Sequence, residues 1–124
     1  MPGSARGGLR RGPLGAIPRD RRVRTRREIR RLLRGRGARG TALELYWHPV
    51  EGQPRATCVI PKYGRTSVER NRLRRRLRAL LASELLARPD PRAYLVRARR
   101  QAYELDFQGL AQALRELAKE IPIR

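Results

Sequence analysis

Residues 66–81 read TSVERNRLRRRLRALL, and this stretch predicts the helix around which the rest of the chain folds. Thr66 belongs to the residue types that cap helix N-termini, and Glu69 three positions later completes the pattern of a capping box. Four leucines then recur at helical spacing, within about 100° of one another around the helix axis. They are Leu73, Leu77, Leu80 and Leu81. We therefore expect this side of the helix to pack on a core.

The other side of the same helix consists almost entirely of arginine. Its members are Arg70, Asn71, Arg72, Arg74, Arg75, Arg76 and Arg78. Like charges one turn apart destabilise an isolated helix, and so do cations in its first turn. A solvated structural surface, which is the alternative interpretation, would include more glutamate than the single Glu69 that precedes Glu84. We therefore interpret these arginines as phosphate contacts to a folded RNA.

Strand-like segments lie on both sides of this helix. Residues 55–60 and 92–98 have strand character, and a helix between two strands is typical of a crossover between parallel neighbours. Residues 41–48 alternate, with Trp47 on the leucine side and Tyr46 on the opposite side. The short connection between 41–48 and 55–60 predicts that these two strands pair as an antiparallel hairpin.

Two further amphipathic helices complete the chain. One covers about residues 25–34, with Ile29 and Leu33 among its apolar side chains, and the other begins near Asp106. The order helix, strand, strand, helix, strand, helix predicts an α+β fold. We expect a small two-layer sandwich in which helices pack on a mixed sheet.

The charge of the chain indicates an anionic partner. There are 31 basic and 11 acidic residues, which gives a formal net charge of +20, and all but two of the basic residues are arginine. Such a charge destabilises the compact state through self-repulsion until an anion relieves it. Nucleic acid is the expected partner and a membrane surface the alternative. A high-GC genome would explain the preference for arginine over lysine equally well, but it would not explain the net charge.

Composition divides the chain into three regions. Residues 1–18 are rich in Gly, Pro and Arg and are expected to form a disordered basic arm. Residues 19–121 contain the predicted elements and form a single RNA-binding domain, and residues 122–124 are a tail. No stretch approaches the roughly 20 apolar residues of a membrane span, and the N-terminus lacks the apolar core of a secretory signal. A cytoplasmic protein is therefore expected.

Few residues of the chain are suited to catalysis. His48 is the only histidine, and we interpret it as a solvated loop residue rather than a general base. Cys58 has no histidine near it in the pattern and is interpreted as a small buried hydrophobe. No Cys/His cluster has metal-ligand spacing, and the acids are scattered. We expect a binding protein with no catalytic side chain and no metal site of its own.

The arginine-rich helix and the loop before it resemble the bacterial ribonuclease P protein family, whose pattern is close to K-x-x-G-x-A-V-x-R-N-R-x-K-R-x-x-R. The matching positions are Lys62, Ser67, Val68, Arg70, Asn71, Arg72, Arg74, Arg75 and Arg78. The family's glycine falls at Arg65 in a gapless alignment, or at Gly64 if the loop is shifted by one residue. The resemblance extends over about residues 19–121, and the RNR block is its most specific part. The chain departs from the family where a Ser-Lys-Lys loop becomes Pro61-Lys62-Tyr63, and where two aromatic positions of the first helix become Ile29 and Leu33.

The resemblance implies an α-β-β-β-α-β-α order with a short extra strand near residues 37–40. It also implies a left-handed crossover around the RNR helix, whereas the general preference is right-handed. In function, it implies a protein that binds the catalytic RNA of ribonuclease P and the 5′ leader of precursor tRNA. The RNA, with Mg²⁺, carries out the endonucleolytic cleavage that matures the tRNA 5′ end. The protein raises affinity for substrate and metal, and no obligate protein partner is implied.

Two groups of site residues are expected. The RNA-binding group is Lys62, Arg70, Asn71, Arg72, Arg74, Arg75 and Arg78. The leader-binding cleft, between the first helix and the sheet, would include Ile29, Leu33 and Tyr46, with Tyr46 either stacking on a nucleotide or buried in the core. Asn71 has low helix propensity, so we expect its amide to bind a nucleotide or the loop around Lys62, unless it is an incidental surface residue. The alternative functions are a ribosomal or assembly RNA-binding protein without a nuclease role, and a protein-only nuclease.

Overall fold

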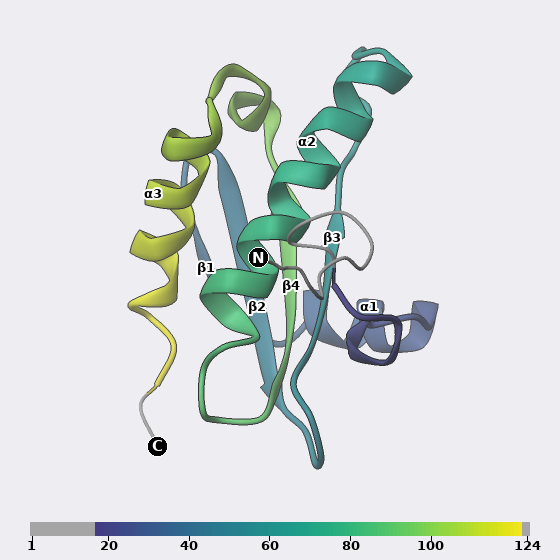
Figure 1. The fold of residues 1–124 in the computed structure, drawn as a ribbon, viewed down its shortest axis with the longest axis vertical. Helices are drawn as coiled ribbons and strands as arrows, with labels where there is room; N and C mark the ends of the chain where they lie inside the picture. Colours follow the sequence, from purple (N-terminus) through teal and green to yellow (C-terminus); the bar gives the residue numbers. More distant parts are fainter. Residues whose placement is uncertain (1–16, 123–124) are drawn as a thin grey trace, which may run out of the picture.

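The computed structural model describes residues 17–122, which form three α-helices and a four-stranded sheet (Figure 1). The main elements are α1 (Arg26–Leu33), β1 (Arg36–Arg39), β2 (Leu43–Pro49), β3 (Arg55–Val59), α2 (Ser67–Leu80), β4 (Arg92–Ala98) and α3 (Phe107–Ala118). Three short turns join them: η2 (Arg19–Arg21), the π-helical turn η3 (Leu81–Leu85) and η4 (Arg100–Glu104). The α+β class and the α-β-β-β-α-β-α order are as expected, including a short strand close to residues 37–40.

The order of strands across the sheet is β1-β2-β4-β3. β2 pairs antiparallel with β1 and with β4, and β3 pairs with β4 in parallel. The expected hairpin between β2 and β3 is therefore wrong, because β4 lies between them. The reason lies in β4 itself, where every residue except Arg97 is buried. A strand that is apolar on both faces is most stable at the centre of a sheet, whatever the length of neighbouring connections.

The β3–α2–β4 crossover is left-handed. In Figure 1, β3 and β4 both run upward, α2 lies in front of the sheet and runs downward, and β4 lies to the left of β3. Seen from the helix side, a right-handed crossover would place the second strand to the right of the first. The handedness implied by the family resemblance is therefore present. The crossover sets α2 across the sheet with its N-terminus near the end of β4 (Figure 1).

The core has two parts, one on each face of the sheet. On one face, the leucines of α2 and α3 pack against Leu43, Leu45, Trp47 and Val96. On the other face, Leu32 of α1 packs against a smaller group of residues. That group is Val23, Tyr46, Ala93 and Leu95, with Ile29, Leu33, Val50 and Val59 at its margin. α2 and α3 thus form one layer on the sheet, and α1 covers part of the opposite face.

The boundaries of the folded domain differ slightly from those expected. Ile17 is buried at 2% exposure and belongs to the main core, so the folded part begins before Arg19. At the other end, the carbonyl of Pro122 accepts a hydrogen bond from Arg92 at 2.9 Å. The rest of the predicted arm, residues 1–16, and residues 123–124 of the predicted tail lie outside the described residues. No helix within residues 17–122 has the length and apolar character needed to cross a membrane.

We predict that Leu77→Ala destabilises the domain by about 2–5 kcal/mol, because it leaves a cavity between α2 and the sheet. Leu77 is fully buried, whereas Val68 of the same helix is 66% exposed. Urea unfolding followed by circular dichroism gives the free energy of unfolding of each variant. Val68→Ala is the matched control, and its free energy should stay within about 0.5 kcal/mol of the wild type. Equal effects of the two substitutions would contradict the packing described for α2.

Candidate RNA-binding surface

The arginines of α2 form a surface that the rest of the domain does not neutralise. Asn71, Arg72, Arg75 and Arg78 are exposed, while Arg70, Arg74 and Arg76 are half-buried. No arginine of α2 makes an ion pair with a carboxylate among the described residues. We call the set of Arg70, Asn71, Arg72, Arg74, Arg75 and Arg78 the docking face. Because its guanidinium groups have no internal counter-ions, this face is available to an external polyanion.

Hydrogen bonds within the helix orient part of the docking face. Arg74 donates a hydrogen bond from Nη1 to Oδ1 of Asn71 at 2.9 Å, and Arg70 donates to the hydroxyl of Ser67 at 3.4 Å. The amide of Asn71 thus positions an arginine one turn along, rather than binding the loop around Lys62. The Nε atom of Arg70 is buried and has no partner among the described residues. A buried N–H donor without a hydrogen-bond partner destabilises the free protein, and an acceptor atom of a bound ligand would remove this desolvation penalty.

The N-terminus of α2 is anchored by carboxylates. Thr66 and Glu69 form the predicted capping box, since each side chain accepts a hydrogen bond from the backbone N–H of the other residue. Arg65 forms an ion pair with Glu69 at 3.2 Å and a second one with Glu104 of η4 at 2.5 Å. The pKa of Glu69 is held below its ordinary value, first by the backbone N–H of Thr66 and then by the Arg65 guanidinium. The start of the docking face is therefore fixed to η4, the turn that follows β4.

The loop before α2 contains a tight turn. Tyr63 and Gly64 both have positive φ angles, of 48° and 74°, and the N–H of Arg65 donates to the carbonyl of Lys62 at 2.8 Å. This is the geometry of a type I′ turn. Gly64 therefore has a backbone conformation that favours glycine, one residue before Arg65, where a gapless alignment places the family's glycine, and the exposed Lys62 begins the turn. The turn lies directly before the helix that carries the RNR block.

The three residues predicted for a leader-binding cleft lie together on the opposite face of the sheet. Ile29 and Leu33 of α1 are half-buried beside Tyr46 of β2. Tyr46 is only 6% exposed, and its hydroxyl donates to Glu44 at 2.6 Å. Gly37 of β1 lies so close that a Cβ atom there would be 2.7 Å from the Tyr46 ring. The ring is thus covered by its neighbours, and Ile29 and Leu33 are the more accessible members of the group.

Two arginines beside this group were not predicted. Arg97 is the one exposed residue of β4, and the strand register aligns it with Glu44 of β2 and Val59 of β3. Arg39 of β1 pairs with Glu44 in turn, so both arginines lie on the face that α1 only partly covers. A signal was available in the sequence, since Arg97 interrupts an otherwise apolar strand. The face therefore combines aliphatic side chains with cations, and the cations are of the kind that follow the backbone of a single strand.

The residues considered for catalysis have structural partners instead. His48 lies in β2 rather than in a solvated loop; its side chain is 14% exposed and its Nε2 atom is 3.7 Å from Glu28. Cys58 is only partly buried, although it packs against the main core as a small hydrophobe would, and burial raises the pKa of its thiol above the ordinary value. Within residues 17–122, no three His, Cys, Asp or Glu side chains come together as a metal site would require.

Comparison with known proteins identifies similar chains. A family model described as Ribonuclease P matches residues 17–122. A ribonuclease P protein component from Micrococcus luteus is 36% identical over 105 residues, which covers 73% of this chain and 80% of the relative. The fold matches that of the Staphylococcus aureus RNase P protein, with a TM-score of 0.72, 17% identity, and coverage of 80% of this chain and 93% of that one. It also matches the RNase P protein from Thermotoga maritima, with a TM-score of 0.71, 20% identity, and coverage of 82% and 98%.

We predict that the double variant Arg72→Ala/Arg75→Ala binds structured RNA more weakly and with a flatter salt dependence. Removal of each phosphate-binding guanidinium should reduce the slope of log K against log salt concentration by about 0.7 to 0.9. Filter binding or fluorescence anisotropy over a salt series measures the slope. Arg115→Ala is the control, because Arg115 of α3 is already paired with Glu84 at 3.1 Å. An unchanged slope in the double variant would remove both residues from the RNA-binding surface.

We predict that Glu69→Gln destabilises the domain at neutral pH but not in acid. The pKa of Glu69 is lowered by folding, so its contribution to stability is complete above the unfolded-state value of 4.5 and is lost as the pH falls through the folded-state value. The free energies of unfolding of wild type and variant, measured in urea, should therefore differ at pH 7 and become equal well below pH 4.5. Glu51→Gln is the control, since Glu51 is exposed and makes no ion pair among the described residues. A pH-independent difference would exclude the carboxylate as its cause.

Proposed function

This chain belongs to the family of ribonuclease P protein components, and we propose that it binds the catalytic RNA through the docking face and the 5′ leader of precursor tRNA through the opposite face of the sheet. The single observation that supports the first contact is the absence of any carboxylate partner for the α2 arginines within residues 17–122. A helix that keeps such a surface incurs repulsion that only an external anion relieves. Folded RNA, with its closely spaced phosphates, is the anion that matches a rigid row of arginines.

The docking face and Lys62 would act as phosphate ligands. The exposed side chains Arg72, Arg75 and Arg78 can each form paired hydrogen bonds with a phosphate, because the planar guanidinium matches two of its oxygens. Arg70 and Arg74 are held closer to the helix by Ser67 and Asn71, so they would add contacts of fixed direction. Side chains whose rotamers are already restricted lose less entropy when the RNA binds.

The leader would contact the face that carries Ile29, Leu33 and Tyr46. Ile29 and Leu33 offer aliphatic surface, and Arg39 and Arg97 would accompany the backbone of the single strand. Because the Tyr46 ring is covered, we expect it to pack beneath Ile29 and Leu33 and hold them in place rather than to stack on a base. The two RNA contacts would then lie on opposite sides of one sheet, so that the domain bridges the catalytic RNA and its substrate.

In this proposal the RNA performs the cleavage and binds Mg²⁺, and the protein supplies no catalytic side chain. The protein's own contribution is electrostatic, since its positive charge offsets the repulsion between two polyanions that must associate. It would thereby raise the affinity of the RNA for precursor tRNA and for the metal. No protein partner is required for either contact, and the reaction would take place in the cytoplasm, where precursor tRNA is made.

We predict that adding the protein to ribonuclease P RNA at low Mg²⁺ concentration greatly increases the cleavage of precursor tRNA. The reason is that the protein's charge replaces part of the screening that Mg²⁺ otherwise supplies. Cleavage of end-labelled precursor tRNA, resolved on a denaturing gel, gives the rate. The Arg72→Ala/Arg75→Ala variant should need a higher protein concentration for the same rate.

Three controls make this experiment decisive. Arg115→Ala should behave as wild type, because its guanidinium is paired with Glu84. The protein freed of RNA should not cleave by itself, and cleavage in that case would favour a protein-only nuclease. A protein that binds RNA without increasing cleavage would instead favour a ribosomal or assembly function. Either result would reject the proposal.

A further inference from the structure

The turn between β3 and α2 presents a tyrosine in a strained conformation. Tyr63 has a φ angle of 48°, and no other residue except glycine has a positive φ in the part of the chain that the structure describes. The first central position of a type I′ turn favours Asn, Asp or Gly, because a bulky side chain costs conformational energy there. Such strain persists only where surrounding contacts impose it, and it often marks a functional position.

Contacts with the end of β4 and with η4 hold the Tyr63 ring in place. Its hydroxyl donates to the carbonyl of Ala98 at 3.3 Å, and its ring meets that of Tyr103 at 86° with 6.5 Å between the centroids. Tyr103 is fixed in turn, because its hydroxyl donates to the carbonyl of Pro61 at 3.1 Å and the Arg65 guanidinium lies 5.0 Å from its ring centroid. The aromatic pair therefore ties the turn to η4.

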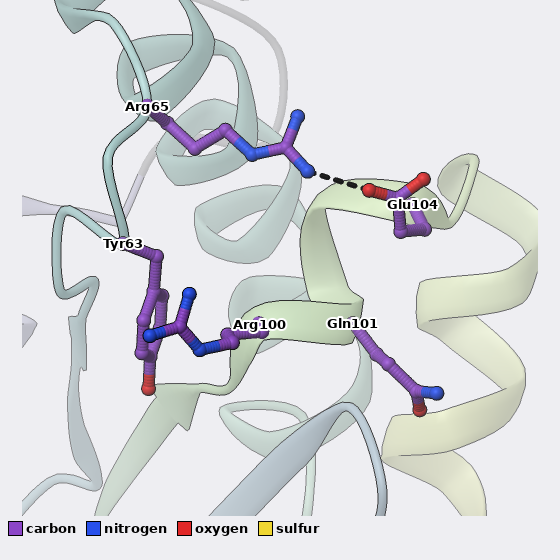
Figure 2. A pocket seen from close by; sticks show the side chains of 5 residues that line it. All are labelled: Tyr63, Arg65, Arg100, Gln101 and Glu104. Atoms are coloured by element: carbon purple, nitrogen blue, oxygen red, sulfur yellow. Dashed lines mark hydrogen bonds and ion pairs between the residues drawn. The ribbon is translucent and has the colours of Figure 1, made fainter.

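Arg100 lies against this fixed ring with its guanidinium 4.9 Å from the Tyr63 centroid (Figure 2). Arg100 is exposed, and it makes no ion pair or side-chain hydrogen bond with another described residue. Arg65 differs, since Glu69 and Glu104 both hold it. A guanidinium that lies on an aromatic ring keeps its N–H donors and one planar face free for a ligand.

Arg100 lines two hollows. One is lined by Tyr63, Arg65, Arg100, Gln101 and Glu104, as Figure 2 shows. The other shares Tyr63, Arg100 and Gln101 and is completed by Thr41 and Arg99. In each hollow a flat cationic group stands beside polar side chains. A planar aromatic ligand that carries a phosphate fits this combination better than a simple anion, which would need no flat surface.

We propose that Arg100, supported by Tyr63, binds one unpaired nucleotide of an RNA. The base stacks on the free face of the guanidinium, and the N–H edge of Arg100 holds the adjoining phosphate. Arg99 adds the donors that are not directed at Glu44 and Gly40. An unpaired nucleotide is specified because a base within a duplex has no face to offer. The inference rests on the proposed function in one respect, namely that RNA is the partner.

The site lies away from Ile29 and Leu33, although Arg99 reaches Glu44 at the end of the leader-binding face that carries Arg39 and Arg97. Tyr63 bonds to Ala98 at the last residue of β4, whereas α1 reaches the sheet through Glu28 and Arg55 near the other end of the strands. Tyr63 precedes the docking face in the chain and is separated from it by the anchored N-terminus of α2, whereas Arg100 follows the docking face. It would extend the contact with RNA around the end of the sheet, away from Ile29 and Leu33.

The test compares two five-nucleotide single-stranded RNAs, one of adenosines and one with abasic riboses at its three central positions. Wild type should bind the complete RNA about tenfold more tightly, since one stacked base contributes about 1–3 kcal/mol. Arg100→Lys keeps the charge but loses the planar group, so the ratio should fall to near one with an unchanged salt slope. Tyr63→Leu should give the same loss, and Arg115→Lys should leave the ratio as in wild type. Equal binding of both RNAs by wild type, or a ratio unaffected by Arg100→Lys, overturns the proposal.

A second experiment identifies the source of the nucleotide. Ribonuclease P RNA and precursor tRNA are each prepared with 4-thiouridine, bound to the full-length protein and irradiated, and the crosslinked peptides are identified by mass spectrometry. We expect a crosslink to the peptide that contains Tyr63 or Arg100 from one of the two RNAs. Binding of both RNAs without any such crosslink overturns the site while leaving the proposed function intact. Failure of wild type to bind ribonuclease P RNA rejects the proposed function, and the pentanucleotide ratio remains a separate measure of the site.

Discussion

The leucine side of α2, packed on the sheet, keeps together arginines that repel one another. Leu73, Leu77 and Leu80 are buried against the core, and each buried leucine contributes about 1.5–3 kcal/mol. A pair of like charges one turn apart costs only about 0.2–0.5 kcal/mol on a helix surface. Burial therefore outweighs repulsion, and the helix forms even though its own surface opposes it. The domain can present unneutralised arginines because its core, rather than its electrostatics, makes the helix stable.

The same packing determines where the arginines point. Because the crossover is left-handed, α2 lies across the face shared with α3, and its N-terminus meets η4 at the end of β4 (Figure 1). The carboxylates near this N-terminus stabilise it, because Glu69 caps the helix and Arg65 forms ion pairs with both Glu69 and Glu104. Acidic side chains thus fix the start of the helix and are absent from its exposed side. This distribution separates the groups that hold the fold from the groups that are available to a ligand.

Local patterns were enough to predict most elements and to place the docking face. The cap at Thr66, the start of α3 near Asp106, the leucine spacing of α2 and the extent of β4 all follow from short-range preferences. The predicted pairing of β2 with β3 is wrong, because β4, which is buried on both faces, lies between them despite their short connection. Alternation placed Tyr46 on the correct side of its strand, but it could not reveal that Gly37 lies against the ring. That contact depends on the register of β1, which no local signal specifies.

The Tyr63–Arg100 pair shows most clearly what local sequence cannot supply. The two residues are far apart in the chain. Tyr63 lies where the loop departs from the family pattern, and Arg100 belongs to no motif described above. They meet because β4 ends beside the turn that precedes α2, a consequence of the parallel pairing of β3 with β4. Favourable folding contacts therefore offset the conformational strain at Tyr63. They also place the guanidinium of Arg100 on the Tyr63 ring before any ligand binds. A site preorganised in this way requires little further ordering on binding, so a stacked base would contribute most of its interaction energy to affinity.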